Sequence, residues 1–307
     1  MKAIKLASIF AVSAVAAAVS TTTFAAEPVF SGEAGVSYTV YGDEDENAAD
    51  TASGTDPAEL ELAIDTGVVY IEIEMAGDAN SDETVNIGLE KAYVTQGAVQ
   101  FGRFDGTLSD AAALGVNENS GIDIIDTTDT DDTAIRYSIT DELTVAIEAT
   151  EGQDGTDEEA ATDTSLAVEA SDAIDSEVGV TLSYIADLGA GTFGISGGSV
   201  GDANAINVGY SMDVGSTTFA VTYGTGETGA ELEEEAVAVS VEMTPTDATT
   251  LNIEYTSYES ETDGVVDEEL DGLYVYASYT AGDLEYYVEH YGKDWGDSTA
   301  VGAKASF

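Results

Sequence analysis

The chain of 307 residues has no cysteine, three prolines and only seven basic residues. Without cysteine it has neither a disulfide framework nor a thiolate site. Because 61 acidic residues give a formal charge of −54, no basic patch exists to neutralise nucleic-acid phosphates, and we exclude nucleic acid as a partner. Small cations are the expected counterparts. Self-repulsion of this size is easiest to tolerate where the Debye length falls to about 3 Å, near 1 M salt, which predicts a halophilic source.

The sequence also lacks an apolar run of the ~18 residues that a spanning helix needs. The one apolar stretch near the start, Leu6–Val19, is short, rich in alanine and preceded by two lysines. Small residues follow at Thr23 and Ala25. This order is typical of a secretory signal peptide. We predict a signal peptide over residues 1–25 and one mature domain over 26–307, with a membrane anchor as the alternative for the first segment.

Motifs of the common enzyme classes are missing too. The sequence has no G-x-S-x-G, H-E-x-x-H or phosphate-binding loop, and its one histidine, His290, lies in an aromatic strand where an interfacial side chain is expected. Carboxylate pairs of the glycosidase kind arise by chance in so acidic a chain. A calcium site near Asp129, Asp131 and Asp132 is conceivable, but the D-x-D-x-D-G spacing is absent. We therefore predict no enzyme, no cofactor and no metal site.

What the mature chain does have is a period of two. In one segment, Ile71 and Ile73 alternate with Tyr70, Glu72 and Glu74, as expected of a strand with one apolar and one polar face. About sixteen such segments follow one another, joined in turn by short turns and by longer acidic segments. This alternation is typical of an up-and-down barrel with two different rims, and an even strand number puts both termini on the short-turn rim.

The first and last strands are expected to close the barrel. Phe30–Tyr41 and Ser298–Phe307 share the same pattern, an apolar face opposite a small and polar one. A strand at the end of a chain has an open edge unless another strand pairs with it. We predict that these two strands pair with each other.

Alternation alone does not say which face points inward. In a soluble sandwich, the apolar faces fill a dry core. In a membrane barrel, they face lipid and carry interfacial aromatic residues near the strand ends. Tyrosines gather on the apolar face here: Tyr38, Tyr184, Tyr210, Tyr223, Tyr255, Tyr279 and Tyr286. Together with the signal peptide and the terminal phenylalanine, they favour the membrane barrel over the sandwich.

Four stretches resemble the general outer-membrane porins of Gram-negative bacteria. The mature start, residues 30–38, resembles the first porin strand. Residues 89–103, ending in Gly102-Arg103, resemble the hairpin before the constriction loop, and the long segment 106–132 stands where that loop belongs. The carboxyl-terminal strand ending in Phe307 resembles the assembly signal of the family.

The resemblance implies an all-β fold: a transmembrane antiparallel up-and-down β-barrel of 16 strands with a long loop folded into the lumen. It further implies a homotrimer in the outer membrane, reached by export through the periplasm, with membrane lipid and lipopolysaccharide as partners. The activity implied is passive diffusion of small hydrophilic solutes and ions.

Porins of this family set basic residues on the barrel wall against acids on the constriction loop. The corresponding residues here are Asp105, Asp110, Glu118, Asp123 and Asp126 on the acidic side, and Arg103, Arg136 and Lys91 on the basic side. Arg136 alternates with Ile135 and should face the lumen. Strict alternation puts Arg103 and Lys91 on the apolar side, so either a β-bulge turns each of them inward or the expected register is wrong.

The polar faces of the strands carry many glutamates, which the barrel would direct into the lumen: Glu33, Glu59, Glu61, Glu72, Glu74, Glu90, Glu148, Glu242, Glu254, Glu285 and Glu289. Carboxylates that line a pore concentrate cations and repel anions. We therefore expect a cation-preferring channel. The alternatives are a substrate-specific outer-membrane channel and a secreted acidic β-rich protein that binds cations or a surface partner.

Overall fold

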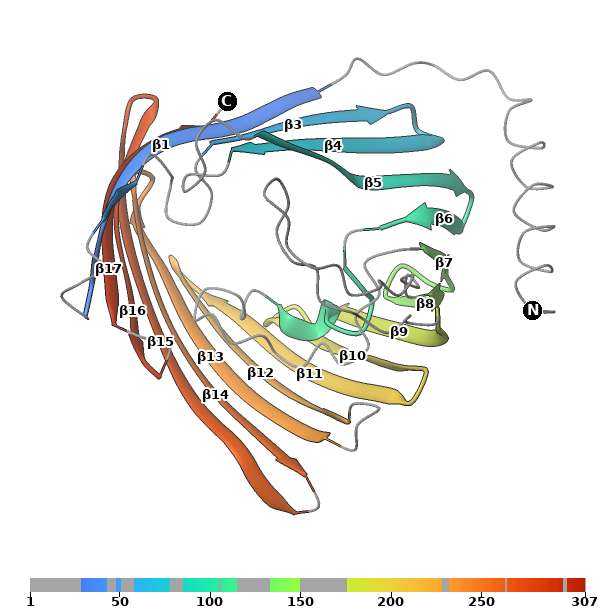
Figure 1. The fold of residues 1–307 in the computed structure, drawn as a ribbon. Coiled ribbons are helices and arrows are strands. Elements are labelled where there is room, and N and C mark those ends of the chain that lie inside the picture. The colour runs from blue at the N-terminus through green and yellow to red at the C-terminus, as the bar shows by residue number, and fades with distance from the viewer. Residues whose placement is uncertain are drawn as a thin grey trace, which may run out of the picture.

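A computed structural model describes residues 29–42, 48–50, 58–77, 85–104, 106–114, 133–149, 176–227, 232–262, 264–294 and 297–306. Almost all of this part is strand (Figure 1). The strands are β1 (Val29–Tyr41), β2 (Ala48–Asp50), β3 (Ala58–Asp65), β4 (Val69–Gly77), β5 (Val85–Gln96), β6 (Val99–Arg103), β7 (Thr133–Ser138), β8 (Leu143–Ala149), β9 (Val178–Asp187), β10 (Thr192–Val200), β11 (Ala203–Val214), β12 (Thr217–Glu227), β13 (Leu232–Thr246), β14 (Thr249–Thr262), β15 (Val265–Ala281), β16 (Leu284–Lys293) and β17 (Ser298–Ser306).

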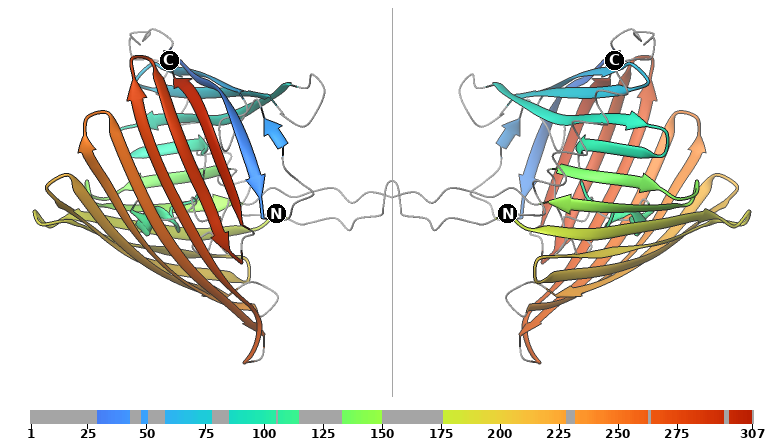
Figure 2. Two further views of the ribbon diagram at one scale, coloured as in Figure 1. Left: turned by 90° about the vertical axis from the view of Figure 1, so that its left-hand side faces the viewer. Right: turned by 90° about the vertical axis from the view of Figure 1, so that its right-hand side faces the viewer.

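Antiparallel pairing runs in an unbroken series round the molecule. β1 pairs with β3, each strand from β3 to β16 pairs with the next, and β17 pairs back to β1. The last pairing extends from Glu33 opposite Ser306 to Tyr41 opposite Ser298. Figures 1 and 2 show the result, a ring of tilted strands around a central space, hereafter the lumen. The predicted pairing of the first and last strands is confirmed.

Sixteen of the described strands make the wall, since β2 is a three-residue strand that pairs only with the middle of β1. β1 begins, and β17 ends, at the rim that also carries the tight connections β3–β4 and β5–β6. The predicted fold, an up-and-down barrel with both described chain ends at the short-turn rim, is confirmed.

The apolar side chains of the wall point outward. Val36, Val180 and Val301 are 59%, 60% and 47% exposed. Tyr38 and Tyr286, on the same face, are also exposed. No helix in the described ranges has the length and hydropathy to cross a membrane. A soluble sandwich would bury these valines in a dry core, so the outward apolar face decides against that alternative.

Small and polar side chains cover the inner face of the same strands. Ser37, Thr181, Thr222 and Thr256 are buried, although each alternates with an exposed or half-exposed neighbour. Side chains on the concave face of a curved sheet converge, so small residues fit there. The wall is therefore polar inside and apolar outside, which is the arrangement that a transmembrane barrel requires.

Three connections are shorter than the sequence pattern predicts. The alternation of short turns with longer acidic segments predicts a long loop over residues 198–203, but β10 ends at Val200 and β11 begins at Ala203. The connections β12–β13 and β14–β15 are shortened in the same way. The acidic and glycine-rich residues of these segments continue the strands beyond the apolar band, because a wall above the membrane needs no apolar face.

Candidate functional site

A segment of the chain leaves the wall after β6 and lies inside the barrel. Residues 106–114 carry a short 3-10 helix, η1 (Ala111–Ala113), which contacts β9, β10, β11 and β12. Figure 1 shows η1 on the inner side of β10 and β11. The described part of the predicted constriction loop therefore narrows the lumen from one sector of the wall.

Hydrogen bonds hold this segment to the wall. The Ala112 amide donates to Ser196 Oγ at 3.0 Å. The hydroxyl of Ser196 and the amide Nδ2 of Asn207 both donate to the carbonyl of Ser109, at 2.5 and 2.8 Å. Thr222 Oγ1 donates to the Ala113 carbonyl at 2.7 Å. Side chains of β10, β11 and β12 thus satisfy the backbone groups that a short helix leaves unpaired.

Two glycines on the wall make room for η1. A Cβ built on Gly209 would lie 1.9 Å from the Ala112 carbonyl oxygen, and one on Gly194 would lie 3.1 Å from Ala112 Cα. Real Cβ atoms do not approach other atoms as closely as the first distance, so η1 lies directly on the backbone of β11. Any larger residue at position 209 would displace it.

An ion pair between two wall residues holds the first residues of the same segment. Glu148 of β8 accepts a hydrogen bond from the Thr107 hydroxyl at 2.5 Å and one from the Leu108 amide at 3.3 Å. Arg136 of β7 lies 3.5 Å from Glu148 and donates to the Gly106 carbonyl at 2.6 Å. The Glu148 side chain is fully buried and that of Arg136 is 16% exposed. The guanidinium is thereby committed to a carboxylate and a backbone carbonyl.

A stack of three aromatic rings adjoins this ion pair on the wall. The Arg136 guanidinium carbon lies 4.1 Å from the centroid of the Phe104 ring. Phe104 stacks on Tyr93 and Tyr93 stacks on Tyr70, with centroids 4.9 and 5.0 Å apart. These contacts order the exit of the chain from β6 into the lumen, and they add a cation–π contact to the ion pair of Arg136.

A β-bulge in β5 turns Lys91 to the polar face. Glu72 pairs with Lys91 and Ile73 pairs with Leu89, so Glu90 is the extra residue. Lys91 Nζ lies 2.6 Å from Glu72 and 3.3 Å from Glu90, and the Tyr70 hydroxyl donates to Glu72. Of the two explanations that the sequence allows for a lysine on the apolar side, a β-bulge and a wrong register, the bulge is the one present at Lys91. Arg103 shows no such shift and pairs in regular register with Ala92 and Thr133.

The carboxylates of Glu61, Glu72 and Glu90 lie within 4.8 Å of one another. Such a group has the donor set of a divalent cation site. Here the ammonium of Lys91 already lies between two of the three carboxylates. Lys91 therefore offsets part of the negative charge of this cluster, at the position that a cation would take between Glu72 and Glu90.

The register places the other predicted lumenal glutamates on the polar face of the wall. Glu61 and Glu74 are directly opposite each other, and Glu242 lies opposite Thr218. Glu254 and Glu289 are buried on this face, and Glu285 lies 3.8 Å from Lys304. The pairing sets Glu33 opposite Glu59, but their side chains are outside the described part of the structure.

Of the predicted constriction acids, the structure describes one. Asp110 precedes η1 at its N-cap position, on the segment that crosses to the wall. Asp105, Glu118, Asp123 and Asp126, and the assembly residue Phe307, lie outside the described residues. Of the predicted basic residues, Arg136 lies at the start of the lumenal segment, where it donates to the Gly106 carbonyl. Lys91 donates to Glu72, the same carboxylate that Tyr70 of the aromatic stack contacts.

Sequence reasoning missed the residues that dock the loop. Ser196, Asn207 and Thr222 look like ordinary polar positions of alternating strands. Their function depends on which loop backbone faces them, and residues more than 80 positions away provide it. The only signal in the sequence is the pair of glycines, Gly194 and Gly209, in strands that would otherwise prefer larger residues.

Known proteins resemble this chain in structure and not in sequence. No protein-family model and no curated protein matches it. The trimer form of in-vitro folded OmpT, an outer membrane protein of Vibrio cholerae, matches with a TM-score of 0.61 at 14% identity, over 92% of this chain and 99% of that one.

Two further solved structures show how widely the fold is used. OmpF of Salmonella typhi in complex with daunomycin matches with a TM-score of 0.62 at 12% identity, over 92% of this chain and all of that one. The anion-selective porin from Comamonas acidovorans gives 0.56 at 11%, over 92% and 99%. Because the matched chains are covered almost from end to end, the chain has the fold of the Gram-negative outer-membrane porins.

Proposed function

We propose that the chain is a passive diffusion channel of the outer membrane that conducts small hydrophilic solutes and prefers cations. The observation that carries the proposal is the charge on the polar face of the wall. Nine of the predicted glutamates have described side chains on this face. The basic groups that contact members of this set, Lys91, Arg136 and Lys304, are each within 4 Å of a carboxylate.

Electrostatics explains why this balance favours cations. A carboxylate neutralised by a neighbouring lysine contributes little to the potential of the pore, whereas Glu74 and Glu242, which form no ion pair with another described residue, add their full charge to it. The structurally similar Comamonas porin is described as anion-selective, so the fold does not decide the sign. The side chains on the polar face do.

The reversal potential in a planar bilayer tests the proposal. With a gradient of KCl we expect a sign that corresponds to potassium passing more readily than chloride. Changing both Glu74→Gln and Glu242→Gln should lower the permeability ratio by about twofold or more, the Boltzmann factor for charges ~8 Å from a permeating ion in water. Glu235→Gln, on the outer face, is the matched control. Chloride preference in the unmodified protein would refute the proposal.

The assembly and export of the protein are part of the same proposal. The Vibrio OmpT structure is described as a trimer form, and we infer a homotrimer for this chain, embedded in membrane lipid and lipopolysaccharide. Residues 1–25 are removed during export to the periplasm. Mass spectrometry of the purified protein should give a mature chain that begins at Ala26, and light scattering in detergent should give three copies.

A further inference from the structure

One sector of the lumenal wall is aromatic. Four tyrosines share the polar face of two neighbouring strands, β15 and β16: Tyr274, Tyr276, Tyr287 and Tyr291. The register establishes the face, since Tyr274 is opposite the buried Glu254 and Tyr276 is opposite the buried Glu289. Elsewhere, small side chains cover most of this face. These four tyrosines therefore face the lumen, whereas the exposed tyrosines of the apolar face point toward lipid.

The four rings form a continuous series along the wall, hereafter the tyrosine series. The centroid of the Tyr274 ring lies 5.0 Å from that of Tyr291 and 6.3 Å from that of Tyr276. The Tyr276 centroid lies 6.0 Å from that of Tyr287. From Tyr287 to Tyr291 the series extends about 13 Å, at ~3.3 Å per residue. Tyr274 and Tyr287 are buried, whereas Tyr276 and Tyr291 are partly exposed, so a solute in the lumen can reach the last two.

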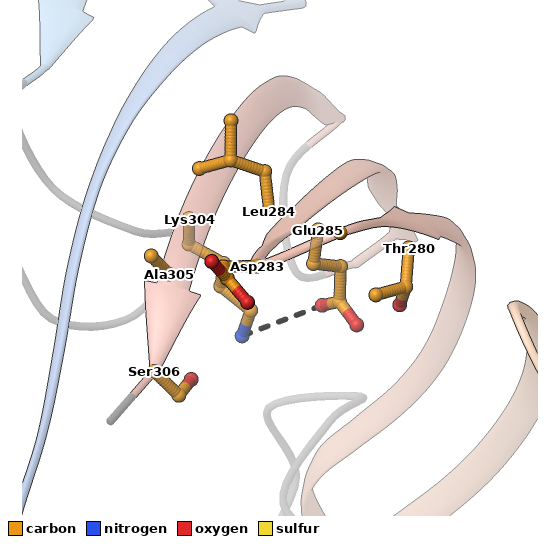
Figure 3. Close-up of a pocket in the computed structure, with 8 residues that line it drawn as sticks. Thr280, Asp283, Leu284, Glu285, Lys304, Ala305 and Ser306 are labelled. Carbon is orange, nitrogen blue, oxygen red and sulfur yellow. Dashed lines mark ion pairs between the residues drawn. The ribbon is translucent and has the colours of Figure 1, made fainter.

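An ammonium of the protein lies at the short-turn end of the tyrosine series. Lys304 Nζ is 5.7 Å from the centroid of the Tyr287 ring and 3.8 Å from Glu285 Oε1 (Figure 3). The same carboxylate oxygen accepts a hydrogen bond from the Tyr276 hydroxyl at 2.5 Å. The wall thus holds one of its own cations next to an aromatic ring and a carboxylate, and both groups attract positive charge.

The rest of the tyrosine series has the same two kinds of group without a basic side chain. Glu289 is opposite Tyr276 and accepts a hydrogen bond from the Tyr274 hydroxyl at 3.5 Å. In the ranges that the structure describes, Glu289 forms no ion pair, and no lysine or arginine lies over the ring of Tyr276 or Tyr291. A cation from the lumen that lies on these rings would supply the missing positive charge.

We propose, resting on the diffusion-channel function proposed above, that the tyrosine series binds small organic cations of the quaternary ammonium class as they pass through the lumen. The methyl groups of the solute pack on the exposed ring surfaces of Tyr276 and Tyr291. The ring quadrupoles and the Glu289 carboxylate attract its charge. An uncharged solute of the same shape gains only the packing, and an anion is repelled.

Two solutes of the same shape test the role of the charge: choline and dimethylbutanol, the uncharged analogue in which a carbon atom replaces the nitrogen. Each is titrated into the full mature protein in micelles of a polyoxyethylene detergent, which has neither a choline nor a sugar headgroup. The heat of binding is measured by calorimetry, and the titration into empty micelles is subtracted. We expect choline to bind in a saturable way and dimethylbutanol to bind at least about fivefold more weakly, the factor expected for one cation–π contact.

Three double variants test the role of the rings. The pair Tyr276→Leu and Tyr291→Leu removes both exposed rings but keeps apolar side chains, and it should weaken choline binding by about fivefold or more. The pair Tyr276→Phe and Tyr291→Phe keeps the rings and should retain choline binding. The matched control is Tyr279→Leu with Tyr286→Leu, which changes two exposed tyrosines that pair on the outer face of the same strands. This control should also bind choline like the unmodified protein.

Equal binding of choline and dimethylbutanol would overturn the proposal in favour of an apolar patch. Equal loss of binding in the phenylalanine and leucine variants would overturn it in favour of the hydroxyls. The reversal potential in a KCl gradient is measured on the same preparation. Cation preference without choline binding would refute the organic-cation site alone, and choline binding by a protein that does not conduct would refute the channel.

Discussion

Glu148 shows how one side chain on the wall can order a loop inside the barrel. It is fully buried and accepts hydrogen bonds from Thr107, from the Leu108 amide and from Arg136. A buried carboxylate is tolerated when its oxygens are bonded and a cation is adjacent. The same bonds attach the first residues of the lumenal segment to β7 and β8.

Glu148→Gln is expected to loosen that attachment. The amide keeps the shape of the side chain but removes the charge, and Arg136 is left in a buried position without its carboxylate. Loss of one partner of such a pair costs about 2–4 kcal/mol, so the midpoint of thermal unfolding should fall and proteolysis within residues 106–114 should become faster. Glu242→Gln, an exposed lumenal glutamate, should change neither. Equal stability of Glu148→Gln and the unmodified protein would show that the network does not hold the segment.

At the scale of the element, η1 is positioned by the wall and not by its own sequence. Three residues cannot form a stable helix alone, and the bonds from Ser196, Asn207 and Thr222 replace the missing intrahelical ones. The lumen is narrowed on the side of β9–β12 because Gly194 and Gly209 allow the close approach there.

Gly209→Val should therefore release η1 from β11. A Cβ at this position would lie 1.9 Å from Ala112 O, and the neighbouring carbonyl is backbone, which cannot turn aside. The barrel itself should persist, because valine suits a strand. Single-channel conductance is the measurement, and we expect it to differ from that of the unmodified protein by more than the scatter between channels.

Gly88→Ala is the control for this variant, since a Cβ on Gly88 meets nothing within 4 Å. It should leave the conductance unchanged. If Gly209→Val conducts like Gly88→Ala, the segment does not shape the pore.

The elements also show what the sequence could and could not predict. The period of two gives the strands and the polarity of their faces, because those depend on residues that are neighbours in the chain. The bulge at Glu90 was one of two open explanations, since a bulge leaves no composition signal beyond a charged residue on an apolar face. The docking of residues 109–113 depends on contacts over more than 80 residues, which a single sequence does not contain.

At the scale of the whole molecule, acidic residues continue the wall beyond the outward tyrosines. The hydroxyl of Tyr223 lies 3.0 Å from Glu235. Toward the rim with the longer connections, glutamates of neighbouring strands lie directly opposite one another in two rows. One row consists of Glu227, Glu233 and Glu261, and the other of Glu235, Glu259 and Glu269. Neighbouring strands are about 4.8 Å apart, and like charges directly opposite each other destabilise a sheet.

This arrangement predicts that salt stabilises the pairing of β12–β15 at the ends that carry the two glutamate rows, hereafter their upper ends. Raising NaCl from about 20 mM to about 1 M shortens the Debye length from some 20 Å to about 3 Å and should weaken the repulsion within each row. Amide hydrogen exchange at the upper ends of β13 and β14 should therefore slow as salt is added. In the double variant Glu233→Gln, Glu259→Gln, exchange should already be slow in low salt, because each row loses its central charge. Glu242→Gln, which lies on the same strand but outside both rows, should retain the salt response of the unmodified protein. An unchanged salt response in the double variant would mean that the large net charge acts on the molecule as a whole and not through these two rows.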